Sequence, residues 1–302
     1  MKYIYYPGCS LKSTGRAYEE SILAVFQALN VPLVELEDWN CCGATSYVSI
    51  DEEEAFTLAA RNLALAESGI GQNGEEISLV APCSACFLVL TKTQRYLGMY
   101  PQVRRSVRAG LEAAGLRYTG KVKVRHPLDV LVNDIGKQAI AKAVKRPLKG
   151  LKVACYYGCQ IVRPFATFDH AQYPTSMDTV IKALGAEPVD WPLKTRCCGG
   201  SLTGTIQEAG LRLNRALLKE GIKRGADVML TCCPLCQHNL ECYQDRINRL
   251  FSEDLHLPIA YFTQLMGVAF GIDQKTLAMQ RLFVRPSFPP ARKEGEPAHV
   301  SA

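Results

Sequence analysis

Apolar residues in this chain are gathered into short runs that alternate with longer segments of mixed polarity. The runs at residues 77–82 and 227–231 are nearly continuous and rich in β-favouring residues, as is typical of strands buried on both faces of a parallel sheet. The segments 52–67 and 206–224 are predicted helices. Alternating strands and helices predict βα units with right-handed crossovers, and therefore an α/β fold with mainly parallel sheets.

The same order of elements occurs twice, and the offset from Cys9 to Cys159 is 150 residues. The predicted pairs are helices 21–29 and 177–184, strands 31–39 and 186–192, helices 52–67 and 206–224, strands 77–82 and 227–231, helices 84–96 and 235–250, and strands starting at 122 and 258. We therefore expect two pseudo-twofold-related βα domains, residues 1–147 and 148–285, joined within residues 145–150. The tail 286–302 is rich in proline and charge and is predicted to be mobile.

Ten of the thirteen cysteines fall into two sets of the same form, a lone cysteine, a CCG triplet and a CxxC. The first set is Cys9, Cys41, Cys42, Cys83 and Cys86, and the second is Cys159, Cys197, Cys198, Cys233 and Cys236. Each motif follows a predicted strand, and the loops at the carboxyl ends of parallel strands converge on one rim. Each half is therefore predicted to bring five thiols together at the strand carboxyl ends. Gly43 and Gly199 follow the adjacent pairs, where a positive φ would relieve crowding.

Three kinds of site could use these thiols. A structural zinc ion needs four ligands, a dithiol redox site needs only the CxxC, and an iron–sulfur cluster uses thiolates throughout. Five cysteines per set favour an iron–sulfur cluster, with zinc and thiol redox chemistry kept as alternatives. Cys155, Cys232 and Cys242 lie outside the sets; we expect Cys155 to be a buried apolar residue and Cys242 to have no role.

Composition limits the class of protein. The chain has 302 residues, 48% hydrophobic and 21% charged, with a formal net charge of +6. No run reaches the ~18 apolar residues of a membrane span, and the first residues do not resemble a signal peptide. We expect a cytoplasmic protein whose cysteines bind metal instead of forming disulfides. Basic residues near 104–108 and 142–149 lack interleaved aromatics and a nucleic-acid motif, so a solvated face or a docking surface for an acidic partner is favoured over nucleic-acid binding.

The doubled cysteine motif resembles the cysteine-rich CCG domain in the B subunit of heterodisulfide reductase. The resemblance extends to four further stretches and covers about residues 1–285. These stretches are YPGCS near the start, VRHPLDVLVNDIG from Val124, YYGCQIVRP from Tyr156 and PIAYFTQLMGVAFGID from Pro258. The doubled motif is specific to the superfamily and less specific to the reaction.

The resemblance implies two noncubane 4Fe–4S clusters, one on each set of five cysteines named above, with one cysteine of each adjacent pair bridging irons. It also implies two-electron reduction or formation of a disulfide whose sulfurs are bound between the two clusters. Arg163 and Arg196 are next to cysteine motifs and are candidates to attract an anionic disulfide or thiol substrate. Because no nucleotide-binding fingerprint is present, a ferredoxin-like iron–sulfur subunit and a flavoprotein subunit are expected partners.

Other functions stay open for the same motif. One is a subunit of the heterodisulfide-reductase-like complex of sulfur oxidisers, acting on a thiol or persulfide. Another is the anchor subunit, without membrane spans, of a succinate or fumarate oxidoreductase, which predicts an amphipathic membrane-facing helix. Residues 262–270 are apolar, but their composition favours a core helix. A third alternative is a scaffold with two zinc sites and no turnover.

Overall fold

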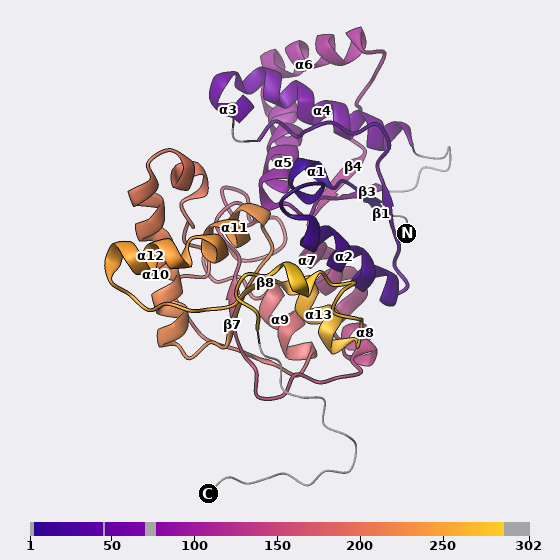
Figure 1. Cartoon of the computed structure of the whole chain (residues 1–302). Helices are drawn as coiled ribbons and strands as arrows, with labels where there is room; N and C mark the ends of the chain where they lie inside the picture. The colour runs from indigo at the N-terminus through magenta and orange to yellow at the C-terminus, as the bar shows by residue number, and fades with distance from the viewer. Residues whose placement is uncertain (1–2, 45, 70–76, 287–302) are drawn as a thin grey trace, which may run out of the picture.

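Two four-stranded, all-parallel sheets form the centre of this protein, seen here in a computed structural model that describes residues 3–44, 46–69 and 77–286 (Figure 1). The first sheet has the order β2-β1-β3-β4, with β1 Tyr3–Tyr5, β2 Leu33–Glu35, β3 Ile77–Val80 and β4 Val122–Arg125. The second has the order β6-β5-β7-β8, with β5 Lys152–Tyr156, β6 Glu187–Pro188, β7 Val228–Thr231 and β8 Ile259–Tyr261. The equal strand orders confirm the duplicated α/β fold.

Helices connect the strands in each half. In the first half they are α1 Gly8–Leu11, α2 Arg16–Ala28, α3 Ser46–Ile50, α4 Glu52–Ser68, α5 Ser84–Met99, α6 Pro101–Ala113, α7 Pro127–Asp129 and α8 Gly136–Ala143, with a π-helical turn at Val130–Ile135 between the last two. In the second half they are α9 Ser176–Ala183, α10 Gln207–Lys223, α11 Pro234–Cys242, α12 Gln244–Phe251 and α13 Phe262–Ala269. Apart from the helix predicted over residues 235–250, each predicted helix is present within about five residues of its expected bounds.

The helix predicted over residues 235–250 is divided, and this expectation was wrong. Tyr243 has φ −102° and ψ 5°, so the backbone leaves the helical conformation between α11 and α12. The side chain of Gln244 compensates: its Nε2 donates to the carbonyl oxygens of Leu240 at 2.9 Å and Leu257 at 2.8 Å. The amide thereby satisfies a carbonyl at the end of α11 that has lost its helical partner.

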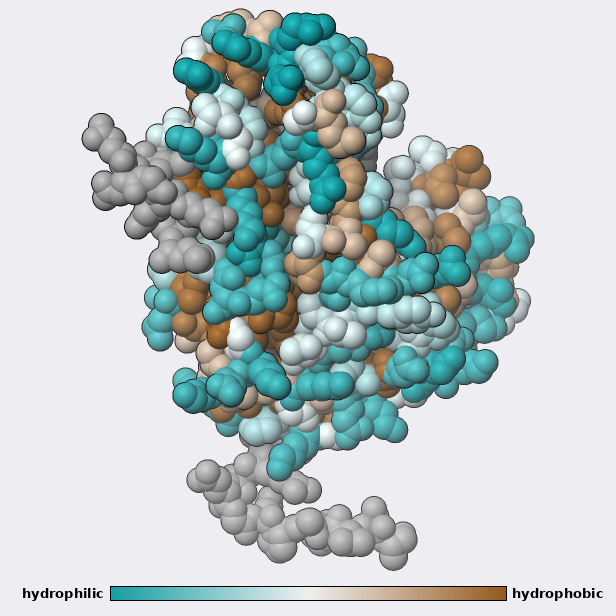
Figure 2. Space-filling view, turned by 180° about the vertical axis from the view of Figure 1, so that it is seen from behind, coloured by the Kyte–Doolittle hydropathy of each residue, from teal (hydrophilic) through white to brown (hydrophobic). Residues whose placement is uncertain are grey.

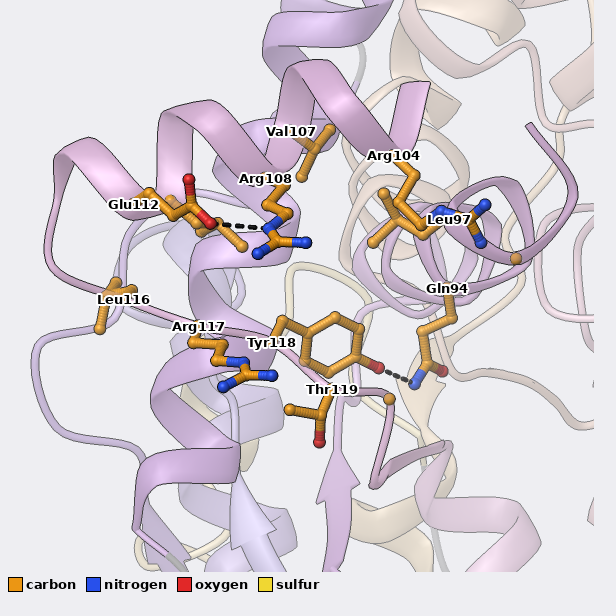
Figure 3. Close-up of a pocket in the computed structure, with 13 residues that line it drawn as sticks. Gln94, Leu97, Arg104, Val107, Arg108, Glu112, Leu116, Arg117, Tyr118 and Thr119 are labelled. Atoms are coloured by element: carbon orange, nitrogen blue, oxygen red, sulfur yellow. Dashed lines mark hydrogen bonds and ion pairs between the residues drawn. The ribbon is translucent and has the colours of Figure 1, made fainter. Parts of the chain in front are cut away.

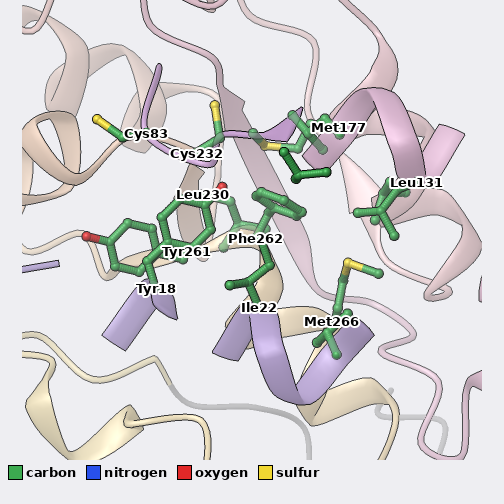
Figure 4. Close-up of a cluster of buried hydrophobic side chains, with 14 of the residues drawn as sticks. Tyr18, Ile22, Cys83, Leu131, Met177, Leu230, Cys232, Tyr261, Phe262 and Met266 are labelled. Atoms are coloured by element: carbon green, nitrogen blue, oxygen red, sulfur yellow. The ribbon is translucent and has the colours of Figure 1, made fainter. Parts of the chain in front are cut away.

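The two halves pack against each other through corresponding helices. Helix α2 of the first half packs against α13 of the second, and α9 of the second half packs against α7 and α8 of the first (Figure 1). The rings of Tyr18 and Tyr261 stack with centroids 4.4 Å apart, and the hydroxyls of Ser21 and Thr263 are 2.6 Å apart. Figure 4 shows this shared core, with Cys83 and Cys232 together at one edge of it.

All residues of α13 are buried, which confirms that this apolar segment is a core helix. Residues 144–151 connect the halves, and the N–H groups of Lys145 and Arg146 both donate to the carbonyl of Ala269 at the end of α13. The boundary between residues 147 and 148 stays a prediction. The predicted tail lies outside the described residues beyond residue 286.

The end of the described chain is held by a buried carboxylate. Glu241 is 4% exposed and accepts hydrogen bonds from the N–H of Phe283 at 2.8 Å and from Gln237 Nε2. Burial raises the pKa of Glu241 to about 7, although these donors oppose the shift. Between pH 4.5, its ordinary pKa, and pH 7, the carboxyl of Glu241 is therefore more often protonated in the folded chain than in the unfolded chain.

We therefore expect Glu241 to contribute a downward slope: its share of the free energy of unfolding falls as the pH rises from about 4.5 to about 7 and then levels off, whereas buried His126, whose pKa is lowered from 6.5 to about 4, contributes in the opposite direction. The share of Glu241 drops by at most about 3–4 kcal/mol, because one pKa unit corresponds to about 1.4 kcal/mol. Glu241→Gln should remove this slope in denaturant unfolding curves recorded at several pH values. Glu112→Gln, at an exposed position on α6, serves as the control and should retain the slope. If the pH dependence of Glu241→Gln equals that of the wild type, the raised pKa of Glu241 is contradicted.

Candidate metal centres

The first set of thiols is assembled by three loops that follow β1, β2 and β3. Cys9 lies in α1 directly after β1, and Cys83 caps the amino end of α5. The Sγ atoms of Cys42 and Cys86 are 3.2 Å apart, and those of Cys41 and Cys9 are 3.9 Å apart. The structure thus brings thiols from all three motifs of the first half into contact pairs, as the parallel topology predicts.

The second set repeats this arrangement after β5, β6 and β7. The Sγ atoms of Cys198 and Cys236 are 3.5 Å apart. The thiols of Cys159 and Cys197 lie close enough for each to shift the pKa of the other. The N–H of Gly199 donates to Cys197 Sγ at 3.3 Å. Cys233 precedes α11 in the way that Cys83 precedes α5, so the assembly of the two sets matches motif by motif.

Glycines hold the backbone close to the thiols. Gly43 has φ +80° and Gly199 has φ +93°, which confirms the left-handed conformation expected after the adjacent cysteines. Gly8 and Gly158 also have positive φ, and a Cβ there would lie 2.9 Å from Cys86 Sγ and 3.1 Å from Cys236 Sγ. The sequence reasoning did not identify these two positions as part of the site.

A pair of buried tyrosines, also missed by the sequence reasoning, supports the two sets. The hydroxyl of Tyr6 donates to the carbonyl of Asn40 at 2.8 Å, and that of Tyr156 donates to the carbonyl of Arg196 at 2.7 Å. Each acceptor is the residue directly before an adjacent cysteine pair. The tyrosines therefore position the two CCG loops in the same way. Both tyrosines lie three residues before a lone cysteine, and this repeated position could have identified them from the sequence.

The thiols shift each other's pKa values in opposite directions. Hydrogen bonding to Cys41 raises the pKa of Cys9 and lowers that of Cys42. In the second set, hydrogen bonding between Cys159 and Cys197 raises the pKa of the first and lowers that of the second. Sulfurs this close cannot all become thiolates unless a positive charge offsets their repulsion. The donor set therefore fits a cationic metal–sulfide group bound by thiolates.

Across the interface between the halves, Ser84 of the first CxxC segment contacts Cys232, the residue directly before the second CxxC segment. Ser84 Oγ donates to the carbonyl oxygen of Cys232 at 3.3 Å and lies 3.8 Å from its Sγ. Beneath them, the hydroxyls of Tyr18 and Tyr261 are buried and have no hydrogen-bond partner among the described residues. The charges of nearby CxxC cysteines contribute to the raised pKa of both tyrosines, after burial. Unpartnered donors beside the thiols also fit a bound group with acceptor atoms.

Within the described part of the chain, no three histidine, cysteine or carboxylate side chains are grouped as ligands of one metal ion. The thiol contacts described above are pairs, and the ten-cysteine ligand set stays a prediction. Of the other cysteines, Cys155 is buried as expected, and Cys242 is exposed and contacts His238 Nδ1 at 3.4 Å. Cys232 is buried, and its Sγ lies 3.7 Å from the carbonyl oxygen of Tyr157.

The two candidate arginines differ in their surroundings. Arg163 is half-buried and donates to the carbonyl of Thr195, and its charge contributes to the lowered pKa of Cys197. Arg196 is exposed. His126 is fully buried and caps α7 by accepting from the N–H of Leu128 at 3.2 Å. Burial lowers its pKa to about 4, so the ring is neutral and structural.

A cavity of about 420 Å³ lies apart from the thiols, between α5, α6 and residues 116–120. Its lining combines apolar side chains with Arg104, Arg108 and Arg117, which surround Tyr118 in Figure 3. Arg108 pairs with Glu112 at 2.6 Å. The basic residues predicted on α6 thus form an exposed face beside a concave surface. Hydrophilic side chains cover most of the face seen in Figure 2, with hydrophobic patches between them.

No helix in the described ranges is both long and apolar enough to cross a lipid bilayer. The family of the cysteine-rich CCG domain matches the chain twice, over residues 3–91 and 153–241. The solved structure of a hypothetical protein from Helicobacter pylori shares the fold, with a TM-score of 0.73 at 14% identity. The similarity covers 95% of this chain and 52% of that one, so this chain spans about half of its length.

Several named relatives align over nearly the whole chain. The membrane anchor subunit of the 8-methylmenaquinol:fumarate reductase of Wolinella succinogenes is 31% identical, over 92% of this chain and 95% of its own. The B subunit of the ferredoxin/F420H2-dependent CoB–CoM heterodisulfide reductase of Methanosarcina acetivorans is 27% identical, over 91% of each chain. A protein of Archaeoglobus profundus that is named as similar to the heterodisulfide reductase B subunit is 29% identical, over 92% and 93%.

Proposed function

Since this chain belongs to the family of the duplicated cysteine-rich CCG domain, we propose that it is the iron–sulfur catalytic subunit of an oxidoreductase that reduces or forms a disulfide. The observation that carries the proposal is the contact of Ser84, inside the first CxxC, with Cys232, directly before the second CxxC. This contact supports a site shared by the two halves, because it joins the ends of their CxxC segments across the interface. A disulfide also has two sulfurs, so each half can receive one of them.

The proposed cofactors are two noncubane 4Fe–4S clusters, held by the two sets of five cysteines. When bound, such clusters would supply the electrons for the reaction, one at a time. The chain's own residues hold the thiols in position through Gly8, Gly158, Tyr6 and Tyr156. Arg163 supplies a positive charge near Cys197, where an anionic substrate or thiolate product would be attracted.

Reduction of a disulfide requires two electrons and two protons and yields two thiols. The electrons must come from other proteins, because the chain has no nucleotide-binding fingerprint. We propose a ferredoxin-like iron–sulfur subunit as the direct partner and a flavoprotein subunit beyond it. Five free thiols are exposed or half-exposed among the described residues, including Cys9 and Cys197. Free thiols at the surface persist in a reducing compartment, and we propose the cytoplasm.

The test is a measurement of iron, acid-labile sulfide and zinc in the full chain purified without oxygen. We expect about eight irons and a similar amount of sulfide per chain, as two 4Fe–4S centres require. Two zinc ions without sulfide would overturn the proposal and favour the scaffold alternative. Disulfide reductase activity of the assembled complex, supplied with a low-potential electron donor, then tests the reaction itself.

A second candidate is a subunit of a quinol:fumarate or succinate oxidoreductase, favoured by the 31% identity to the Wolinella succinogenes subunit. In that case the chain would not turn over a disulfide. The native complex, isolated through a tag on this chain, distinguishes the two. Fumarate or succinate turnover without disulfide turnover supports the second candidate, and the converse supports the first.

A further inference from the structure

The two thiol sets differ at one buried position, three residues after the last cysteine of each set. In the second set this residue is Asn239, which is fully buried, and in the first it is Val89. Asn239 Nδ2 lies 3.5 Å from Cys198 Sγ. The side chain of valine has no polar hydrogen, so that of Val89 cannot donate to the equivalent Cys42. The second set therefore has a side-chain donor at a position where the first has none.

The orientation of the Asn239 amide follows from its neighbours. Thr203 Oγ1 donates to Asn239 Oδ1 at 3.0 Å, so the oxygen end of the amide faces Thr203 and the nitrogen end faces the thiols. Nδ2 also donates to the carbonyl oxygen of Gly200 at 2.9 Å and lies 3.4 Å from that of Cys198. One amide hydrogen is thus used by Gly200, and the other is directed at Cys198.

A second difference concerns charge. Four residues after the lone cysteine, the second half has Arg163 and the first has Ser13. The Arg163 guanidinium is held by the carbonyl of Thr195, two residues before Cys197. Ser13 is uncharged, and its hydroxyl donates to the carbonyl of Cys9 at 3.0 Å. The second loop therefore has a positive charge at the position where the first has an uncharged serine, and the cation of the first loop, Lys12, is paired with Glu19 and Glu35 at 2.7 Å.

Building on the proposed function, we propose that the second centre has the higher reduction potential of the two. Reduction adds negative charge to a cluster and its sulfur ligands. A hydrogen bond to a ligating sulfur and a nearby cation both stabilise that charge. The first electron added to the chain should therefore reside on the second set, and the first set should be reduced at a more negative potential. Asn239 and Arg163 act through Cys198 and Cys197 and are positioning and tuning residues.

The experiment is a potentiometric titration of the full chain, followed by electron paramagnetic resonance. Each step adds one electron from the titrant and breaks no bond. In Cys41→Ala, which retains the second set, the midpoint potential should equal the more positive of the two wild-type midpoints. In Cys198→Ala, which retains the first set, it should equal the more negative one. The reverse order, or equal midpoints in samples that retain half of the wild-type iron, would overturn the inference.

Asn239→Val gives the second set the residue of the first. We expect the more positive midpoint to move to a more negative value, with the other midpoint and the iron content unchanged. Arg163→Gln, which can still donate to Thr195, should cause a shift in the same direction and tests the charge if Asn239→Val loses iron. Unchanged midpoints in both variants at full iron content would contradict the inference. Wild-type chain without iron and sulfide would instead overturn the proposed function, and the metal measurement separates these two failures.

Discussion

Replacing Cys198 by alanine is expected to lower the iron content from about eight to about four per chain and to reduce disulfide turnover to background. Cys198 Sγ contacts Cys236 Sγ at 3.5 Å, and all five thiols of a set are proposed ligands of one cluster. Loss of one proposed ligand should therefore remove that cluster without disturbing the other set. Cys41→Ala should have the same effect on the first half. Iron and sulfide analysis, together with the assay of the complex, provides the measurement.

Cys242→Ala is the matched control, because Cys242 is exposed and belongs to neither set. It should retain full iron, full sulfide and full turnover. Normal turnover by Cys198→Ala with half of the iron missing would contradict the requirement for both centres. A chain that loses all of its iron in either cysteine variant would mean that the two centres do not assemble independently.

Much of the fold could be predicted from the sequence, because strands buried in a parallel sheet and the helices between them have different local patterns. Strand β3 and helix α4, for example, have nearly the bounds that their apolar spacing predicts. The convergence of the cysteines followed from topology alone. What could not be predicted depends on contacts distant in sequence. The stacking of Tyr18 on Tyr261 joins residues of different halves, and no local pattern indicates that α2 packs on α13.

The same limit applies inside the site. The cysteine motifs repeat, and their repetition made the thiol sets visible. Asn239 does not repeat, because its counterpart is Val89, and a search for symmetry overlooks a residue that breaks it. Its contact with Cys198 depends on Thr203, which holds the amide orientation. The division of α11 from α12 likewise depends on Gln244, whose side chain replaces a backbone hydrogen bond.

Replacing Gly158 by alanine is expected to remove the second centre while leaving the first intact. Gly158 has φ +69°, so an alanine there strains the backbone. The new Cβ would also lie 3.1 Å from Cys236 Sγ and would displace this proposed ligand. Gly8→Ala should affect the first set more strongly, because its Cβ would lie 2.9 Å from Cys86 Sγ. We expect each variant to retain about half of the iron, measured together with the unfolding curve.

Gly115→Ala separates the two causes of this loss. Gly115 has the same φ of +69° as Gly158, but a Cβ there would meet no atom within 4 Å. It should therefore show only the backbone cost of about 1–2 kcal/mol in the free energy of unfolding and retain all of its iron. Equal iron loss in Gly115→Ala and Gly158→Ala would mean that backbone strain alone is responsible. Full iron in Gly158→Ala would mean that Cys236 can move away from the new methyl group and still bind. The close approach of Gly158 to Cys236 would then not be required for the second centre.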